Sequence, residues 1–245
     1  EKVAVAISLP ITLKERLIGV LNLGSNYPDH DFTVKNLTRA VRLLSQVGMA
    51  VTAGQSSEEW QGLFLDTIKV LSQIVESRDP FSQGHAVEVS KYALDLAREM
   101  KLDSEEVQII EIAALLHDIG VAGITDGIFR LNKPLSSVER LLIRSHPRLA
   151  VKALAGIPRL SRALPYILHH HENFDGTGYI DGLKGDEIPL GARIIAVAEA
   201  YSAMTAERPY RLAKSKDEAL NELNRAAGTQ FDPQVVSAFS NLPTE

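Results

Sequence analysis

The apolar and polar positions of the chain follow two periods, and one replaces the other near Asp31. In residues 3–9 and 17–23, β-branched apolar side chains alternate with other residues, which is the pattern of β-strands. Residues 10–16 between them predict a hairpin-like connection, and the turn-forming residues of 24–31 predict a loop. The start of the chain is therefore expected to contain two strands.

From Asp31 onward the spacing is helical. Apolar residues recur every three or four positions in 34–44, and the same spacing resumes in 60–75. The polar interval 53–59 contains no proline, so we interpret the whole region as one long connector helix. Its near-heptad apolar stripe suits a homodimer formed through this helix. A stripe that packs on its own domain explains the pattern equally well.

Beyond Val75 the pattern is almost entirely helical. The predicted helices cover residues 84–100, 104–118, 136–145, 147–155, 160–172, 190–206, 216–227 and 233–240. Ser136 with Glu139 predicts a capping box, Asp103 or Ser104 can cap the helix that follows, and Pro147 suits a first helical turn. The glycine-rich residues 174–189 predict an ordered loop. We expect a mainly α protein: an all-α bundle in residues 55–245, preceded by an α/β fragment and connector in residues 1–54.

Composition narrows the possible functions. The 245 residues carry a formal net charge of −5, with a pI of about 5.8, so no basic surface for duplex nucleic acid is expected. No cysteine is present, which excludes disulfides and thiolate metal sites and fits a cytoplasmic location. The longest apolar stretches, such as 194–198, are too short for membrane insertion. The chain opens in mid-pattern without a signal peptide, so we expect a fragment of a longer protein.

Histidines carry the first functional signal. Six of the seven lie between His85 and His171, and only His30 lies elsewhere. His117 and Asp118 end an otherwise apolar helix, where two ionisable side chains must be satisfied by partners or bind something. A capping or hydrogen-bonded pair would also explain these two residues on their own.

Further imidazoles and carboxylates stand at helix ends or interrupt apolar runs. The candidate metal ligands are His85, His117, Asp118, His146, His170, His171 and Glu199. Helix ends that converge on one cavity can present such ligands. Imidazole and carboxylate without sulfur suit iron, manganese, nickel or zinc better than calcium or magnesium. Asp118, with two oxygens, could bridge two ions that activate a hydroxide for attack on phosphorus. Independent core or surface histidines remain the alternative.

Three basic residues could bind phosphate. Arg208 and Arg211 flank a proline and a tyrosine, and Lys133 lies in a predicted loop. A guanidinium matches two phosphate oxygens at once, so the arginine pair is the better candidate. Each of these residues, taken alone, is also explained as a solvated surface charge.

These residues, in this order, resemble the HD-GYP family of bacterial cyclic di-GMP phosphodiesterases, within the HD superfamily of metal-dependent phosphohydrolases. The matching segments are RDPFSQGH (78–85), LLHDIG (115–120), LNKP (131–134), SHP (145–147), HHENFDGTGY (170–179), DGLKGDEIPLGARIIAVAEAYSAM (181–204), RPYR (208–211) and AGTQFDP (227–233). Residues 1–50 resemble the C-terminal half of a GAF sensory domain, through its last two strands and closing helix.

The resemblance implies hydrolysis of cyclic di-GMP to pGpG and onward to GMP. All seven candidate ligands match the family's metal ligands, with Glu199 where most members have aspartate. Phe81 stands where a minority carry a glutamate that supports a third metal, which implies two metal ions here: iron first, then manganese, with zinc or nickel as alternatives. Arg208 and Arg211 match phosphate contacts, and Tyr179 matches the signature tyrosine. His117 and Asp118 would be the catalytic pair.

Three positions depart from the family. Val121 replaces a usual lysine, Ile180 replaces the signature proline, and Ser202 replaces an aspartate common near the metals. None of the three is a primary ligand. Other functions therefore stay open: a cyclic dinucleotide receptor with weak or no turnover, a hydrolase of a different cyclic dinucleotide, or a regulatory scaffold whose metal is structural.

Overall fold

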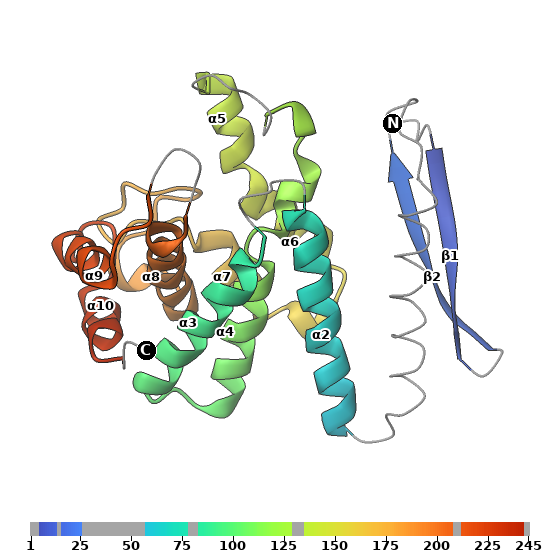
Figure 1. The fold of residues 1–245 in the computed structure, drawn as a ribbon, viewed down its shortest axis with the longest axis horizontal. Coiled ribbons are helices and arrows are strands. Elements are labelled where there is room, and N and C mark those ends of the chain that lie inside the picture. The colour runs from blue at the N-terminus through green and yellow to red at the C-terminus, as the bar shows by residue number, and fades with distance from the viewer. Residues whose placement is uncertain are drawn as a thin grey trace. The chain divides into compact units, whose positions relative to one another are not determined.

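The computed structural model describes residues 5–13, 16–25, 57–77, 83–128, 135–207 and 212–242 (Figure 1). The chain divides into two compact units, Glu1–Thr67 and Ile68–Glu245. The described part is mostly helical, which confirms the predicted fold class. None of the helices in these ranges has both the length and the apolar composition needed to cross a membrane.

The first unit contains an antiparallel hairpin of β1 (Val5–Leu13) and β2 (Arg16–Ser25). Both predicted strands are present, but β1 continues through residues that the sequence assigned to the connection. Pro10 pairs with Val20 inside the ladder. In a two-stranded sheet both strands are edges, so a residue without an N–H can be accommodated. The further GAF-like elements fall on residues 26–56, outside the described ranges.

In the ranges that the structure describes, the helices agree closely with the predicted ranges. They are α2 (Ser57–Glu76), α3 (His85–Glu99), α4 (Ser104–Leu116), α5 (Ser137–Arg144), α6 (His146–Leu154), α7 (Leu164–His169), α8 (Leu190–Thr205), α9 (Lys216–Arg225) and α10 (Pro233–Ser240). Short 3-10 helices are η1 (Ile119–Gly123), η2 (Asp126–Ile128), η3 (Pro158–Leu160) and η4 (Gly185–Glu187). Residues 31–56, where most of the connector helix was predicted, lie outside the described ranges.

The core of the second unit forms where α3 packs against α4 and α8. Each of these helices contributes fully buried side chains to it, for instance Leu96, Ile110 and Ile194. Because α8 is apolar on several faces, it lies inside the bundle, and α7, α9 and α10 pack around it. A polar residue on α8 is therefore held rigidly within the domain.

Local signals fix where the helices begin. The predicted capping box of Ser136 and Glu139 is present, and the Asp103 side chain accepts a hydrogen bond from the Glu106 N–H at 2.8 Å. The predicted helix over 160–172 is shorter than expected, since α7 starts only at Leu164. Pro165 lies in its first turn, where a proline starts a helix but cannot continue one.

The predicted helix over 104–118 also ends early, at Leu116, because the chain must turn toward α6. Gly120 packs directly on the start of α6: a Cβ atom there would lie 2.0 Å from the carbonyl oxygen of His146. Only glycine permits this approach. It brings the residues after α4 next to those that begin α6.

Two side chains hold the C-terminal half of α2, which is part of the second unit, against α3 and α4. The Ser72 hydroxyl donates to the carbonyl oxygen of Leu115. The carboxylate of Glu76 accepts the N–H of Gly84 at 2.8 Å and that of Ala86 at 2.6 Å. These contacts place α2 beside the last turn of α4 and the first turn of α3.

Candidate metal centre

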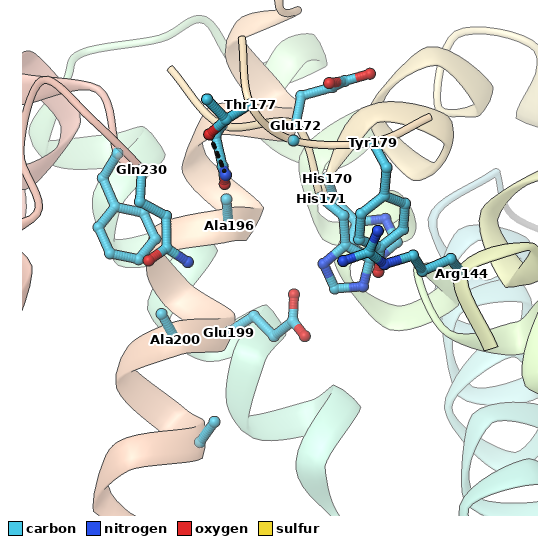
Figure 2. Close-up of a pocket in the computed structure, with 14 residues that line it drawn as sticks. Arg144, His170, His171, Glu172, Thr177, Tyr179, Ala196, Glu199, Ala200 and Gln230 are labelled. Carbon is cyan, nitrogen blue, oxygen red and sulfur yellow. Dashed lines mark hydrogen bonds between the residues drawn. The ribbon is translucent and has the colours of Figure 1, made fainter. Parts of the chain in front are cut away.

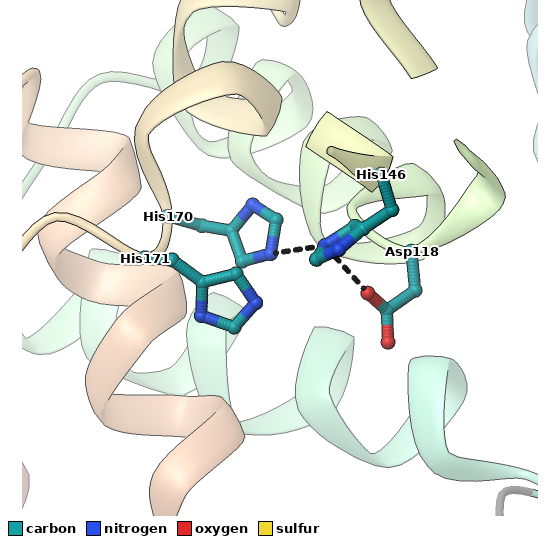
Figure 3. A group of neighbouring side chains, drawn as sticks. All are labelled: Asp118, His146, His170 and His171. Carbon is teal, nitrogen blue, oxygen red and sulfur yellow. Dashed lines mark hydrogen bonds and ion pairs between the residues drawn. The ribbon is translucent and has the colours of Figure 1, made fainter. Parts of the chain in front are cut away.

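The structure gathers all seven predicted ligands into two adjoining groups. One contains Asp118, His146, His170 and His171, and the other contains His85, His117 and Glu199. Within each group, one possible ligand atom from every residue lies within 4.8 Å of the others. The residues come from the ends of α4, α7 and the starts of α3 and α6, while Glu199 projects from the middle of α8. Figure 3 shows the first group.

Three of the histidines are oriented by the backbone in the same way. Each ring presents Nδ1 to the carbonyl oxygen three residues earlier, and the pairs are His117 with Ala114 (2.7 Å), His146 with Ile143 (2.8 Å) and His170 with Ile167 (2.7 Å). A carbonyl oxygen can only accept, so Nδ1 carries the proton. Nε2 of a neutral ring then has a free lone pair, which is the form that binds metal.

Asp118 lies between the two groups. Its Oδ1 is 3.1 Å from Nε2 of His146, and its Oδ2 is 3.4 Å from Nε2 of His117 (Figure 3 shows the first contact). Each carboxylate oxygen therefore faces a different group. This geometry allows one side chain to bridge two cations, as the sequence suggested.

The electrostatics of the cluster favour neutral imidazoles at most positions. Burial lowers the pKa of His85, His170 and His171 below the usual imidazole value. Burial alone would lower the pKa of His117 too, but the carboxylate of Asp118 outweighs it and raises that pKa to about 9. Conversely, burial raises the pKa of the Asp118 carboxyl group, while the adjacent His117 holds it well below its usual range.

The donor set fits a divalent metal ion. Nε2 of His117 is buried and makes no well-formed hydrogen bond with any described residue, since it faces Oδ2 of Asp118 at 3.4 Å. Nε2 of His146 and Nε2 of His170 lie only 3.3 Å apart, so the protein alone brings two ring nitrogens to one point. A cation between such atoms would satisfy them, and a set of imidazoles and carboxylates suits a first-row transition metal.

A cavity of about 280 Å³ opens beside this cluster (Figure 2). Its lining residues include Arg144, His171, Glu172, Tyr179, Ala196, Glu199, Ala200, Gln230 and Phe231. The Tyr179 ring stacks on the His171 ring, with centroids 4.8 Å apart and an interplanar angle of 29°. The Arg144 guanidinium lies over the Tyr179 ring, 5.0 Å from its centroid. Metal ligands, an aromatic ring and a cation thus line one space.

The glycine-rich loop that carries Tyr179 is ordered, as predicted. One buried carboxylate oxygen of Glu172 accepts three successive backbone N–H groups, from Ile180 (2.9 Å), Asp181 (2.7 Å) and Gly182 (3.1 Å). A Cβ atom at Gly178 would lie 2.2 Å from the backbone nitrogen of Asn173, so only glycine fits. The loop is folded tightly against the segment that bears His170 and His171.

The predicted substrate contacts are described only in part. Tyr179 lines the cavity, whereas Lys133, Arg208 and Arg211 fall on residues 129–134 and 208–211, outside the described ranges. Phe81 also lies outside them. Arg144 was missed by the sequence analysis, because a lone arginine at the end of a short amphipathic helix resembles any surface charge. Its position two residues before His146 was the one available signal.

Comparison with known proteins places this site in a family context. The HD domain family profile matches residues 69–235. A cyclic di-GMP phosphodiesterase response regulator of Xanthomonas campestris is 38% identical over 176 residues, which cover 71% of this chain and 47% of that protein. A cyclic di-GMP phosphodiesterase of Thermotoga maritima is 33% identical over 214 residues, with coverage of 86% and 57%. The chain spans about half the length of these curated relatives.

Proteins with other substrate names are also similar. The 3′3′-cGAMP-specific phosphodiesterase 3 of Vibrio cholerae is 33% identical over 209 residues, covering 82% of this chain and 45% of that protein. The crystal structure of a cyclic GMP-AMP-specific phosphodiesterase of V. cholerae aligns with a TM-score of 0.57 at 19% identity, over 72% of this chain and 47% of that one. An HDGYP protein from Bdellovibrio bacteriovorus aligns with a TM-score of 0.56 at 15% identity, over 96% and 98%. These structural likenesses show the fold.

Proposed function

The chain belongs to the HD domain family, and on this premise we propose that it is a metal-dependent phosphodiesterase that hydrolyses cyclic di-GMP. The observation that carries the proposal is the position of Asp118, whose two carboxylate oxygens face different ligand groups. Both groups reach the wall of the cavity, the first through His170 and His171 and the second through Glu199. A phosphodiester held at that wall would meet both groups at once. The product would be pGpG, and GMP after a second cleavage.

The proposed cofactor is a pair of metal ions held by the seven clustered residues, with iron first, then manganese, and zinc or nickel as alternatives. When bound, such ions supply a water of lowered pKa and positive charge beside the phosphorus. The protein's own contribution is orientation. Backbone carbonyls fix three of the rings, and Asp118 sets the spacing of the two groups. We assign the catalytic role to His117 and Asp118 on this basis.

Substrate binding would fall to the cavity and its basic rim. Arg144 can direct guanidinium N–H groups toward a phosphate or a base edge while it stays over the Tyr179 ring. Small side chains on α8, such as Ala196 and Ala200, leave room for a flat base opposite. Lys133, Arg208 and Arg211 remain proposed phosphate contacts from the family resemblance.

A second candidate substrate is 3′3′-cGAMP. It is favoured by the relatives named for that substrate, which are 32–33% identical to this chain. The relatives named for cyclic di-GMP reach 38% identity, so cyclic di-GMP is the first choice. A receptor with slow turnover is the third candidate, because Val121 and Ser202 replace usual active-site residues. Control by a GAF-like region and a homodimer through the connector helix complete the proposal.

The test is to purify the protein anaerobically, measure bound iron and manganese, and assay both cyclic dinucleotides. We expect two metal ions per chain and turnover that the double variant His117→Ala/Asp118→Ala abolishes. His169→Ala is the matched control, since His169 adjoins the ligands in sequence but pairs with Asp181 instead. Stoichiometric metal and tight nucleotide binding without variant-sensitive turnover would overturn the enzymatic proposal. Activity gained by Val121→Lys would then favour the receptor.

A further inference from the structure

Like His146, His85 stands at the start of an α-helix, but its ring is oriented in a different way. It is the first residue of α3, and its Nδ1 does not face a carbonyl oxygen of the preceding turn as in His117, His146 and His170. Instead, Nδ1 of His85 lies 3.1 Å from the hydroxyl oxygen of Ser202 on α8. Its orientation therefore depends on a side chain 117 residues away.

The direction of this hydrogen bond follows from the next contact. The Ser202 hydroxyl lies 2.6 Å from Oε2 of Glu88, and a carboxylate can only accept. The single hydroxyl proton of Ser202 is therefore donated to Glu88. The oxygen of Ser202 is left to accept, so the proton between it and His85 belongs to Nδ1 of the ring.

The outcome for His85 matches what the backbone does for the other histidines. With Nδ1 protonated, Nε2 of the neutral ring keeps its lone pair for the group formed with His117 and Glu199. Ser202 is fully buried on α8, and Glu88 lies one turn after His85 on α3. The ring is thus held by two hydrogen bonds in series, which run from His85 on α3 to Ser202 on α8 and back to Glu88 on α3.

We propose that Glu88 and Ser202 are positioning residues that fix the ring and tautomer of His85, and so complete the His85, His117 and Glu199 metal group. The inference rests on the proposed function in taking His85 as a metal ligand. It also changes the expected effect of having serine in place of aspartate at position 202. The carboxylate that acts on His85 is supplied by Glu88 through the serine hydroxyl, so the absence of aspartate does not leave the ring without an acceptor.

The test combines metal titration with NMR of the histidine side chains, both on the 245-residue chain. In ¹⁵N-histidine-labelled, metal-free protein, we expect the His85 ring to be protonated at Nδ1. Ser202→Ala and Glu88→Gln should weaken the second of two zinc-binding steps by about 10–100-fold, and Ser202→Thr should preserve it. Ser90→Ala, which alters another buried serine in the same bundle, is the control for a general packing defect.

A charge swap makes the test independent of simple destabilisation. Ser202→Asp alone should weaken zinc binding, because it sets a second carboxylate against Glu88. The double variant Ser202→Asp/Glu88→Gln should recover it, because aspartate can then accept directly from His85. Because the single variant sets two carboxylates together and the double variant only one, thermal unfolding of each is measured beside zinc binding, and only a change in affinity of the folded protein counts.

The possible results separate the inference about His85 from the proposed function. Wild-type zinc affinity in Ser202→Ala, or a His85 ring protonated at Nε2 in the wild-type protein, overturns the inference. Zinc binding that depends on Ser202 without hydrolysis of any cyclic dinucleotide overturns the proposed function and leaves the inference intact. A wild-type protein that binds no metal overturns both.

Discussion

The guanidinium of Arg144 lies over the ring of Tyr179, which is itself stacked on His171. A cation within about 6 Å of an aromatic centroid is attracted to the ring face. The three side chains are in successive contact, from Arg144 in the cavity lining through Tyr179 to His171, a candidate metal ligand.

Replacing Arg144 should weaken substrate binding more than catalysis. We expect Arg144→Ala to raise KM for the cyclic dinucleotide about tenfold, equivalent to about 1.4 kcal/mol, with kcat and metal content nearly unchanged. Arg144→Lys should be intermediate, because an ammonium group cannot lie flat on the ring or donate in a fork. Steady-state kinetics would measure this. Arg140→Ala on the same helix is the control, and an unchanged KM in Arg144→Ala would contradict the assignment.

Metal loading should release a proton from His117. Its pKa of about 9 means that the metal-free protein carries a protonated ring at neutral pH, and a ligand nitrogen must be deprotonated. Metal affinity should therefore rise with pH until about pH 9. Calorimetric titration at pH 7.5 in two buffers of different ionisation enthalpy would count the proton. In Asp118→Asn the count should fall, because the charge that raises the pKa of His117 is gone.

The stability of the metal-free protein should also depend on the protonation of His117. The pKa of His117 is raised from an ordinary 6.5 to about 9, so its stabilising effect is complete below pH 6.5 and is lost as pH rises toward 9. His85, His170 and His171 have lowered pKa values and are neutral in both states above pH 6.5, so they do not contribute in this window. Thermal unfolding should show a falling Tm between pH 6.5 and 9. A flat profile identical to that of His117→Gln would refute the assignment.

Gly120→Ala should destabilise the domain at the contact between η1 and α6. The added Cβ would meet the carbonyl oxygen of His146 at 2.0 Å and the nitrogen of Ala150 at 2.6 Å. Backbone atoms cannot move aside cheaply, so we expect a loss of about 2–3 kcal/mol in the free energy of unfolding. Denaturant unfolding would measure it. Gly156→Ala should change little, since nothing lies within 4 Å of the Cβ position there.

Glu76→Gln should loosen the start of α3. The carboxylate of Glu76 accepts two N–H groups that flank His85, and an amide offers only one acceptor oxygen. One N–H would then face another donor, at a cost of about 1–3 kcal/mol. We expect a lower Tm together with weaker binding of one metal ion. Glu207→Gln, at an exposed position, is the control. A lower Tm with unchanged metal affinity would separate Glu76 from the site.

Much of the fold was predictable because its signals are local. Capping residues such as Asp103 and Ser136 mark helix starts within a few residues, and apolar spacing fixes which faces are buried. The sequence also predicted that the seven candidate ligands would cluster. His117 and Asp118 follow an apolar run, and the motifs shared with the family identify the other five. The structure adds their spacing and leaves their role as ligands to experiment.

The features that the sequence analysis did not predict depend on contacts between residues far apart in the chain. Glu88 and Ser202 are 114 positions apart, and no spacing rule connects them. The early end of α4 follows from the close approach of Gly120 to His146, which only the packed structure shows. The position of Arg144 in the site became clear only from its contact with the Tyr179 ring, which lies in a different segment.

The two hydrogen-bonded attachments of α2 have a mechanical consequence. Ser72 holds the carbonyl of Leu115, two residues before His117, and Glu76 holds the N–H groups on either side of His85. An α-helix advances about 1.5 Å per residue, so a slip of α2 by one residue would break both attachments together. The C-terminal half of α2 is thus coupled to the segments that carry His85 and His117, two of the three residues in the group with Glu199. While both attachments hold, the C-terminal half of α2 therefore acts as a brace that keeps the separation of His85 and His117 constant.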